Sequence, residues 1–134
     1  MSEPVIVLDS GVVDRATTDK EFRWVLRDLV EQGWVPLIPT VVLAEAATGT
    51  PADAPLNQTV KAIGTTDATP VTARLAGRLR HSVDRSGVRR IPGGIDAIVA
   101  AHAAEARAGV VFTADPSDLR RLLADSPQIT VTKP

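Results

Sequence analysis

The sequence of 134 residues has no cysteine, no tyrosine and only two histidines, two tryptophans and two phenylalanines. Without cysteine, the chain cannot form disulfide bonds, thiolate metal sites or a cysteine nucleophile. The same absence fits a reducing compartment. The shortage of aromatic side chains argues against nucleic-acid recognition through stacked bases. A metal or catalytic site in this chain would therefore depend mainly on oxygen ligands.

The sequence also lacks a strong net charge and a long apolar segment. Its formal net charge is −1, so no overall positive field attracts nucleic acid, although a local basic patch would suffice. No apolar run approaches the roughly 18 residues of a membrane span, and the N-terminus has no signal-peptide pattern. We therefore expect a cytoplasmic protein without membrane contact, folded as one domain over residues 1–134.

Short apolar strands alternate with helical segments along the chain. The predicted strands cover residues 5–8, 34–38, 110–113 and 129–132. The predicted helices cover residues 19–32, 40–48, 56–63, 72–86, 95–108 and 116–124. This alternation predicts an α/β domain with a parallel sheet, whose strand order the sequence leaves open.

Two aspartates follow predicted strands. Asp9 follows the run VIVL, and Asp115 follows VVF with Thr113 between them. Because parallel sheets bind ligands at the carboxyl ends of their strands, both aspartates are candidates for a shared metal site. Each also has a structural alternative: an Asx turn at Asp9, or a helix N-cap at Asp115 with Asp118 in a capping-box position.

Two further acids lie on predicted helices. Glu45 is surrounded by apolar residues in VVLAEAA, which predicts a buried carboxylate unless the neighbouring alanines leave it exposed. Asp96 lies in the first turn of GGIDAIVAAH, where an acid also suits the helix dipole. If all four acids meet, they repel one another until divalent cations neutralise them. Oxygen ligands suit Mg²⁺ or Mn²⁺, which activate water for phosphodiester cleavage.

A basic stripe is predicted on the helix over residues 72–86. Apolar residues are expected on one side of this helix (Val71, Leu75, Leu79 and Val83). Basic residues are expected on another side and in the following loop (Arg74, Arg78, His81, Arg85, Arg89 and Arg90). Such a stripe fits RNA phosphates, an acidic segment of a partner protein, or only solvent. The two histidines, His81 and His102, have no metal-ligand spacing between them.

The motifs LDSGVV, PTVVLAEA, GGIDAIVAAHA and VFTADPSDLRRL occur in this order. Together they resemble the PIN-domain ribonucleases, above all the VapC-type toxins of bacterial toxin–antitoxin pairs. The resemblance implies an α/β fold of three α/β/α layers, a PIN-like domain with a central parallel sheet. It also implies an Mg²⁺- or Mn²⁺-dependent endoribonuclease that cleaves structured RNA such as tRNA or rRNA. Its implied partners are a second copy, in a homodimer, and a cognate antitoxin.

The resemblance also assigns roles to residues. It implies four catalytic acids, Asp9, Glu45, Asp96 and Asp115, of which Asp9, Asp96 and Asp115 bind the metal. Thr113 and Asp118 match supporting positions, and Ser10 stands where many relatives have a small polar residue or asparagine.

The sequence has three alternative interpretations. A receiver-type signalling domain is disfavoured because Asp9 has no acidic neighbour and the few lysines do not fit its pattern. A PIN-like protein-binding module with weak catalysis, and a housekeeping nuclease of RNA maturation, both stay open.

Overall fold

The computed structural model describes residues 3–85, 87 and 90–134, and within them four short strands form one sheet. These strands are β1 (Val5–Leu8), β2 (Val35–Leu37), β3 (Gly109–Phe112) and β4 (Ile129–Thr132). All pair in parallel, in the order β2-β1-β3-β4. The run VIVL forms a strand because its β-branched side chains are buried between covering helices. All four predicted strands are present, and no bound shifts by more than one residue.

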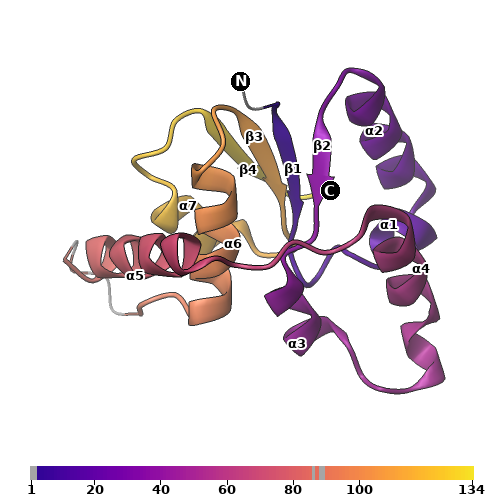
Figure 1. The fold of residues 1–134 in the computed structure, drawn as a ribbon, viewed down its shortest axis with the longest axis horizontal. Coiled ribbons are helices and arrows are strands. Elements are labelled where there is room, and N and C mark those ends of the chain that lie inside the picture. The colour runs from indigo at the N-terminus through magenta and orange to yellow at the C-terminus, as the bar shows by residue number, and fades with distance from the viewer. Residues whose placement is uncertain (1–2, 86, 88–89) are drawn as a thin grey trace.

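Helices cover both sides of the sheet (Figure 1). One group consists of α1 (Arg15–Thr18), α2 (Lys20–Glu31) and α4 (Ala54–Ile63). The other consists of α5 (Pro70–Arg85), α6 (Gly94–Ala104) and α7 (Pro116–Leu122). Between β2 and α4 lie the short α3 (Leu43–Ala46) and two 3-10 turns, η1 (Thr40–Val42) and η2 (Pro51–Asp53). The arrangement confirms the predicted three-layer α/β/α architecture with a central parallel sheet.

The strand order creates a topological switch point between β1 and β3. From β1 the chain crosses to β2 on one side, whereas β3 pairs with the other side of β1 and leads on to β4. The register of β1 and β3 aligns Leu8 with Phe112. The residues that follow, Asp9 and Thr113, therefore leave the sheet side by side at the edge where open α/β sheets bind ligands.

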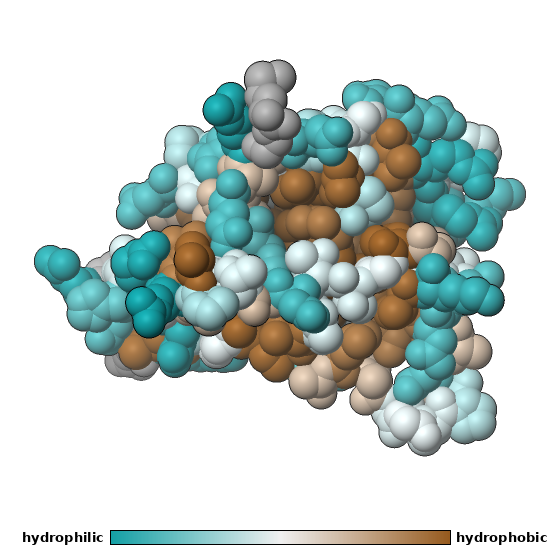
Figure 2. Space-filling model, in the orientation of Figure 1, coloured by the Kyte–Doolittle hydropathy of each residue, from teal (hydrophilic) through white to brown (hydrophobic). Residues whose placement is uncertain are grey.

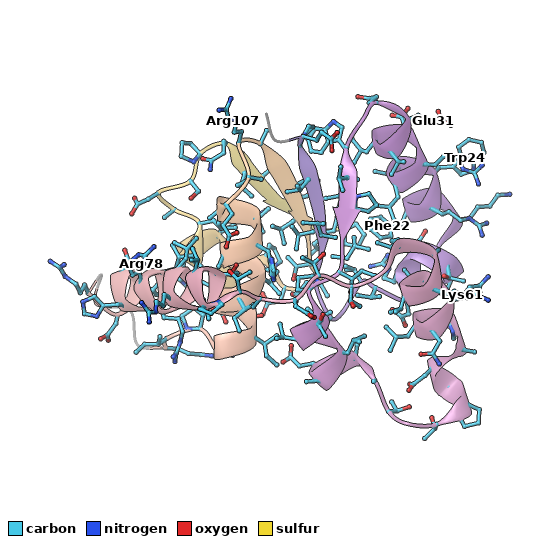
Figure 3. The ribbon with its side chains drawn as sticks, viewed as in Figure 1. Phe22, Trp24, Glu31, Lys61, Arg78 and Arg107 are labelled. Carbon is cyan, nitrogen blue, oxygen red and sulfur yellow. The ribbon has the colours of Figure 1, made fainter. Side chains whose placement is uncertain are left out.

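The core lies between the sheet and the two helix groups. Ile6, Val7 and Val111 have no exposed surface, and Phe22 of α2 packs edge-to-face on Phe112 with ring centroids 4.9 Å apart. Figure 3 shows Phe22 directed into the protein and Trp24 directed outwards. Apolar residues gather in the middle of the face shown in Figure 2, with hydrophilic residues towards its outer edges. This packing holds α2 against the centre of the sheet.

Helix α6 is almost entirely buried, as its alanine-rich sequence predicts. Its buried side chains include Ala97, Val99, Ala100 and Ala101, and small side chains allow α5 and α6 to approach closely. His102 is also buried, at 7% exposure, and its Nε2 atom has no hydrogen-bond partner among the described residues. Burial lowers the pKa of His102, with a smaller opposing effect from Glu105. His102 therefore packs in the fold as a neutral side chain.

Three local predictions were wrong. The segment over residues 40–48 is a 3-10 turn followed by the single turn of α3. Thr40 does not cap it, because its hydroxyl donates to Asp67 at 2.6 Å and its N–H to the carbonyl of Thr66. On α5, Leu75, Leu79 and Val83 face the core as predicted, but Val71 is 71% exposed, and Thr72 and Ala76 are buried as well.

The helices also differ from the sequence interpretation, most clearly at α1 and at the end of α6. The short helix α1 had no predicted counterpart. Helix α6 ends at Ala104, four residues before the predicted end, because the carbonyl of Ala108 already accepts from the N–H of Val5 beside the sheet. No helix among the described residues is both long and apolar enough to cross a membrane.

We predict that His102 makes the protein less stable in mild acid. The unfolded chain binds a proton at the ordinary histidine pKa, whereas the folded chain resists it. The free energy of unfolding should therefore fall as pH decreases through about 6.5. Urea unfolding at about pH 7.5 and 5 should show a smaller decrease for His102→Met than for wild type. His81→Met, at an exposed position on α5, is the control. Equal decreases in wild type and His102→Met would contradict the assignment.

Candidate functional site

Asp9 forms the centre of the candidate site and is held by two hydrogen bonds. The Thr113 hydroxyl donates to Asp9 Oδ2 at 2.8 Å, and the N–H of Ser10 donates to Asp9 Oδ1 at 2.8 Å. Asp9 is 7% exposed and Thr113 is 1% exposed. The side-chain bond joins the ends of β1 and β3, which are 104 residues apart in sequence. The backbone donor is the next residue, Ser10, and not the second residue along, so the Asx turn given as the structural alternative is not formed among the described residues.

Glu45 and Asp96 join Asp9 in a compact group of carboxylates. One carboxylate oxygen from each of the three residues lies within 4.8 Å of the others. Glu45 comes from α3, and its Oε1 atom accepts from the Ser10 hydroxyl at 3.2 Å. Asp96 comes from the first turn of α6 and is partly buried. Three elements distant in sequence thus direct acids to one point.

The reasoning that made Glu45 a candidate was wrong, although its position in the site is as predicted. Glu45 is exposed, and so are its neighbour Ala44 and the following Ala47. Because α3 has only one turn, of its alanines only Ala46 packs against the core, and no apolar layer encloses the Glu45 carboxylate. Glu45 therefore reaches the acid group from the solvent side.

Asp115 and Asp118 lie in the wall of the same pocket. This pocket, of about 190 Å³, is lined by all five acids together with Ser10, Gly11, Arg90, Thr113 and Ala114. Asp115 is the N-cap of α7 and accepts from the N–H of Ser117 at 3.3 Å, as the capping interpretation predicted. Asp118 is buried and is paired with Arg121 at 3.1 Å. Neither belongs to the compact group of Asp9, Glu45 and Asp96.

The pocket is strongly negative, and Asp96 shows the consequence. Burial, followed by the charges of Asp9, Glu45, Asp118 and Asp115, raises the pKa of Asp96 to about 6. The nearest positive group in the pocket is Arg90, which is 3.8 Å from Asp118 and has an 81% exposed side chain. An exposed arginine at that distance neutralises little charge. The carboxylates therefore repel one another unless a cation joins them.

The donor set fits Mg²⁺ or Mn²⁺. The compact group offers only carboxylate oxygens, which hard divalent cations prefer, and no thiolate or imidazole that would favour zinc. Burial and then the neighbouring carboxylates raise the pKa of Asp96, so charging all the carboxylates destabilises the site, and a bound divalent cation would offset the repulsion between them. The residues present therefore match the predicted cofactor.

Two features of the site were missed in the sequence. At Gly11, an added Cβ would lie 3.0 Å from the Cβ of Ala114, so the loops after β1 and β3 approach closely beside the acids. Arg90 was expected to bind RNA or an antitoxin, but it lies in the acid pocket. No spacing rule links Gly11 with Ala114, because the contact depends on strand pairing.

The other basic residues lie apart from the acids. Arg74, Arg78 and Arg85 are exposed on α5 and, with His81, line an open groove of about 780 Å³ that shares no residue with the acid pocket. Figure 3 shows Arg78 on the outer part of α5. Arg89 lies outside the described residues. The predicted basic stripe is therefore present on α5, and its role depends on a partner.

Comparison with known proteins gives a clear result for the fold. No known family profile matches the chain, and no curated protein matches its sequence. The structure is similar to a chain in the crystal structure of VapBC2 from Rickettsia felis bound to a DNA fragment from their promoter. The TM-score is 0.69, with 18% identity over 97% of this chain and 99% of that chain. It is also similar to a chain of DNA-bound VapBC from Salmonella typhimurium, with a TM-score of 0.61, 19% identity and 96% coverage of both chains.

The chain has a PIN-like fold. Both similarities extend over nearly the whole chain, and the parallel sheet has helices on both sides. The resemblance to VapC-type PIN domains is thereby confirmed at the level of the fold. The roles of individual residues in this PIN-like domain depend on the geometry above.

We predict that Asp96→Asn stabilises the metal-free PIN-like domain near neutral pH. The pKa of Asp96 is higher in the folded chain than in the unfolded chain. Asp96 therefore lowers the free energy of unfolding progressively as pH rises from about 4 to 6. In EDTA, urea unfolding at about pH 7.5 should show a more stable variant, and the gain should vanish near pH 4. Asp125→Asn, exposed and outside the pocket, is the control. Adding Mg²⁺ should stabilise wild type more than Asp96→Asn. A variant that is less stable than wild type in EDTA would contradict the repulsion.

Proposed function

We propose that this protein is a metal-dependent endoribonuclease and the toxin of a toxin–antitoxin pair. The observation that carries the proposal is the convergence of Asp9, Glu45 and Asp96 within 4.8 Å at the switch point of a PIN-like fold. Acids at this position of a parallel sheet are suited to hold cations against a phosphate. The similar solved chains come from VapBC structures, which supports the toxin–antitoxin assignment.

Asp9 and Asp96 are the proposed cation ligands, and Glu45 is the third carboxylate of the compact group. The family resemblance implies that Asp115 is also a cation ligand, and this residue lines the wall of the same pocket. When bound, Mg²⁺ or Mn²⁺ would lower the pKa of a coordinated water and stabilise negative charge on the scissile phosphate. Glu45, at the solvent side, is placed to orient the attacking water or accept its proton.

The neighbouring hydroxyls position these acids. Thr113 donates to Asp9 Oδ2 and Ser10 donates to Glu45 Oε1, which restricts the direction in which each carboxylate points. The raised pKa of Asp96 means that this carboxyl holds a proton more readily than an ordinary aspartate and releases it when a cation binds. Cation affinity should therefore increase as the pH rises through about 6 and level off above it.

The proposal extends to the substrate and the partners of the protein. We assign structured RNA, such as tRNA or rRNA, to the acid site and RNA phosphates to Arg74, Arg78 and Arg85 on α5. A cognate antitoxin, a homodimer and a cytoplasmic location stay predictions from the resemblance. The weakly catalytic binding module is the alternative, and it is disfavoured because the acids converge in one pocket.

Cleavage of RNA by the purified protein tests the proposal. Wild type should produce discrete fragments from total RNA with Mg²⁺ or Mn²⁺ and none in EDTA. Asp9→Asn and Asp96→Asn should each remove nearly all activity. Thr113→Val keeps the Asp9 carboxylate but removes the hydrogen bond that orients it, so activity should fall about 10–100-fold. Asp125→Asn is the control for a lost surface charge. If wild type and Asp9→Asn give the same fragments, or if EDTA has no effect, the nuclease assignment fails.

The α5 arginines provide a separate prediction. The double variant Arg74→Gln/Arg78→Gln should bind the RNA substrate more weakly. Its RNA affinity should also depend less on salt, because fewer counterions are released on binding. Fluorescence anisotropy over a range of salt concentrations measures both effects. Arg107→Gln, at another exposed position, is the matched control. An unchanged affinity and salt dependence would assign the stripe to the antitoxin or to solvent instead.

A further inference from the structure

A second cavity adjoins the acid pocket on the side of α3. It has a volume of about 260 Å³ and lies between the loop after β1, the end of α3 and the start of α4. Ser10 and Gly11 line both cavities, so the two are direct neighbours. We call it the Asp14 pocket, with Asp14, Ala46, Ala52 and Leu56 among its lining residues. Its size provides room for a nucleobase beside the proposed site of cleavage.

Most polar side chains of the Asp14 pocket are already engaged. The Asp53 carboxylate accepts from the N–H and hydroxyl of Thr48 and from the N–H of Gly49, at 2.6–3.0 Å. The hydroxyl and N–H of Thr48 lower the pKa of Asp53 as a result. The Ser10 hydroxyl donates to Glu45. These groups stabilise the loop and the acid site, and they leave no side-chain hydroxyl in the pocket to bind an anion.

Asp14 is the exception. It occupies the N-cap position of α1, but its backbone is already helical, with φ −69° and ψ −26°, and its side chain forms no cap hydrogen bond. An effective N-cap normally has extended backbone angles, as Asp19 has before α2. Asp14 is an exposed residue that lines the pocket, and no group among the described residues donates a hydrogen bond to its carboxylate. The pocket thus combines one available acceptor with the apolar side chains of Ala46, Ala52 and Leu56.

We propose that the Asp14 pocket binds the base of a guanosine next to the scissile phosphate. A carboxylate repels phosphate and accepts hydrogen bonds only from donors, so it excludes the phosphates and favours the N–H groups of a base or a ribose hydroxyl. Guanine presents two adjacent N–H donors on its Watson–Crick edge, which match the two oxygens of a carboxylate. RNA nucleases and binding proteins read unstacked bases on this edge. Adenine, cytosine and uracil offer fewer donors there. The inference rests on the proposed endoribonuclease function, whose acid site the pocket adjoins.

Cleavage of a randomised RNA library, with sequencing of the fragment ends, provides the first measurement. Wild type should favour guanosine at one position beside the cut. In a short substrate with that sequence, replacing guanosine by inosine, which lacks the exocyclic amine, should lower kcat/KM about tenfold, a loss typical of one base contact. Asp14→Asn should lose the distinction between guanosine and inosine and still cut other sites. Asp125→Asn should behave as wild type.

A binding measurement separates the pocket from the nuclease assignment. Guanosine, which carries no phosphate, is titrated into the metal-free protein, and NMR follows the backbone amides of Gly11, Asp14 and Thr48. These amides should shift with guanosine, shift less with inosine or adenosine, and not respond in Asp14→Asn. Shifts without RNA cleavage would retain the pocket and reject the nuclease. Cleavage with no base preference, or with a preference unchanged in Asp14→Asn, would reject the pocket and retain the nuclease.

Discussion

The parallel pairing of β1 with β3 is the constraint on which the candidate site depends. It brings the residues that follow Leu8 and Phe112 to the same edge of the sheet, so that Thr113 can donate to Asp9 at 2.8 Å. The loop after β1 then approaches the loop after β3 so closely that Gly11 has almost no room for a side chain beside Ala114. Helices α3 and α6 add Glu45 and Asp96 to this edge. A shift in the register of β1 against β3 would separate all of these groups.

The side chains of the candidate site repel one another electrostatically. Five acids line a pocket of about 190 Å³, and burial together with neighbouring carboxylates raises the pKa of Asp96 to about 6. The two arginines recorded in ion pairs there, Arg90 and Arg121, both interact with Asp118 rather than with the compact group. The well-packed sheet and the alanine-rich α6 supply the stability that tolerates this repulsion. Concentrated charge of this kind is characteristic of sites that function with a bound cation.

Much of the fold and most of the site residues could be predicted from local patterns. Buried strands such as residues 5–8 are continuous apolar runs, and α6 combines a glycine start with small apolar residues. Errors occurred where tertiary contacts override a local signal. Thr40 bonds to the segment at Asp67 instead of capping a helix, and Val71 faces solvent because α5 is rotated to bury Thr72 and Ala76. Glu45 was chosen because its neighbours are apolar, yet the shortness of α3 leaves it exposed.

The sequence by itself determined the chemistry that is available: oxygen ligands without thiolates, acids after two strands, and an α/β succession of elements. These properties depend on residue type and on near neighbours in the chain. The tertiary structure alone decided that Asp9, Glu45 and Asp96 meet, that Asp115 lies in the wall of the same pocket, and that Asp14 lines an adjoining cavity. The physical reason is that these arrangements follow from strand order and helix rotation, which bring together residues that lie far apart in sequence.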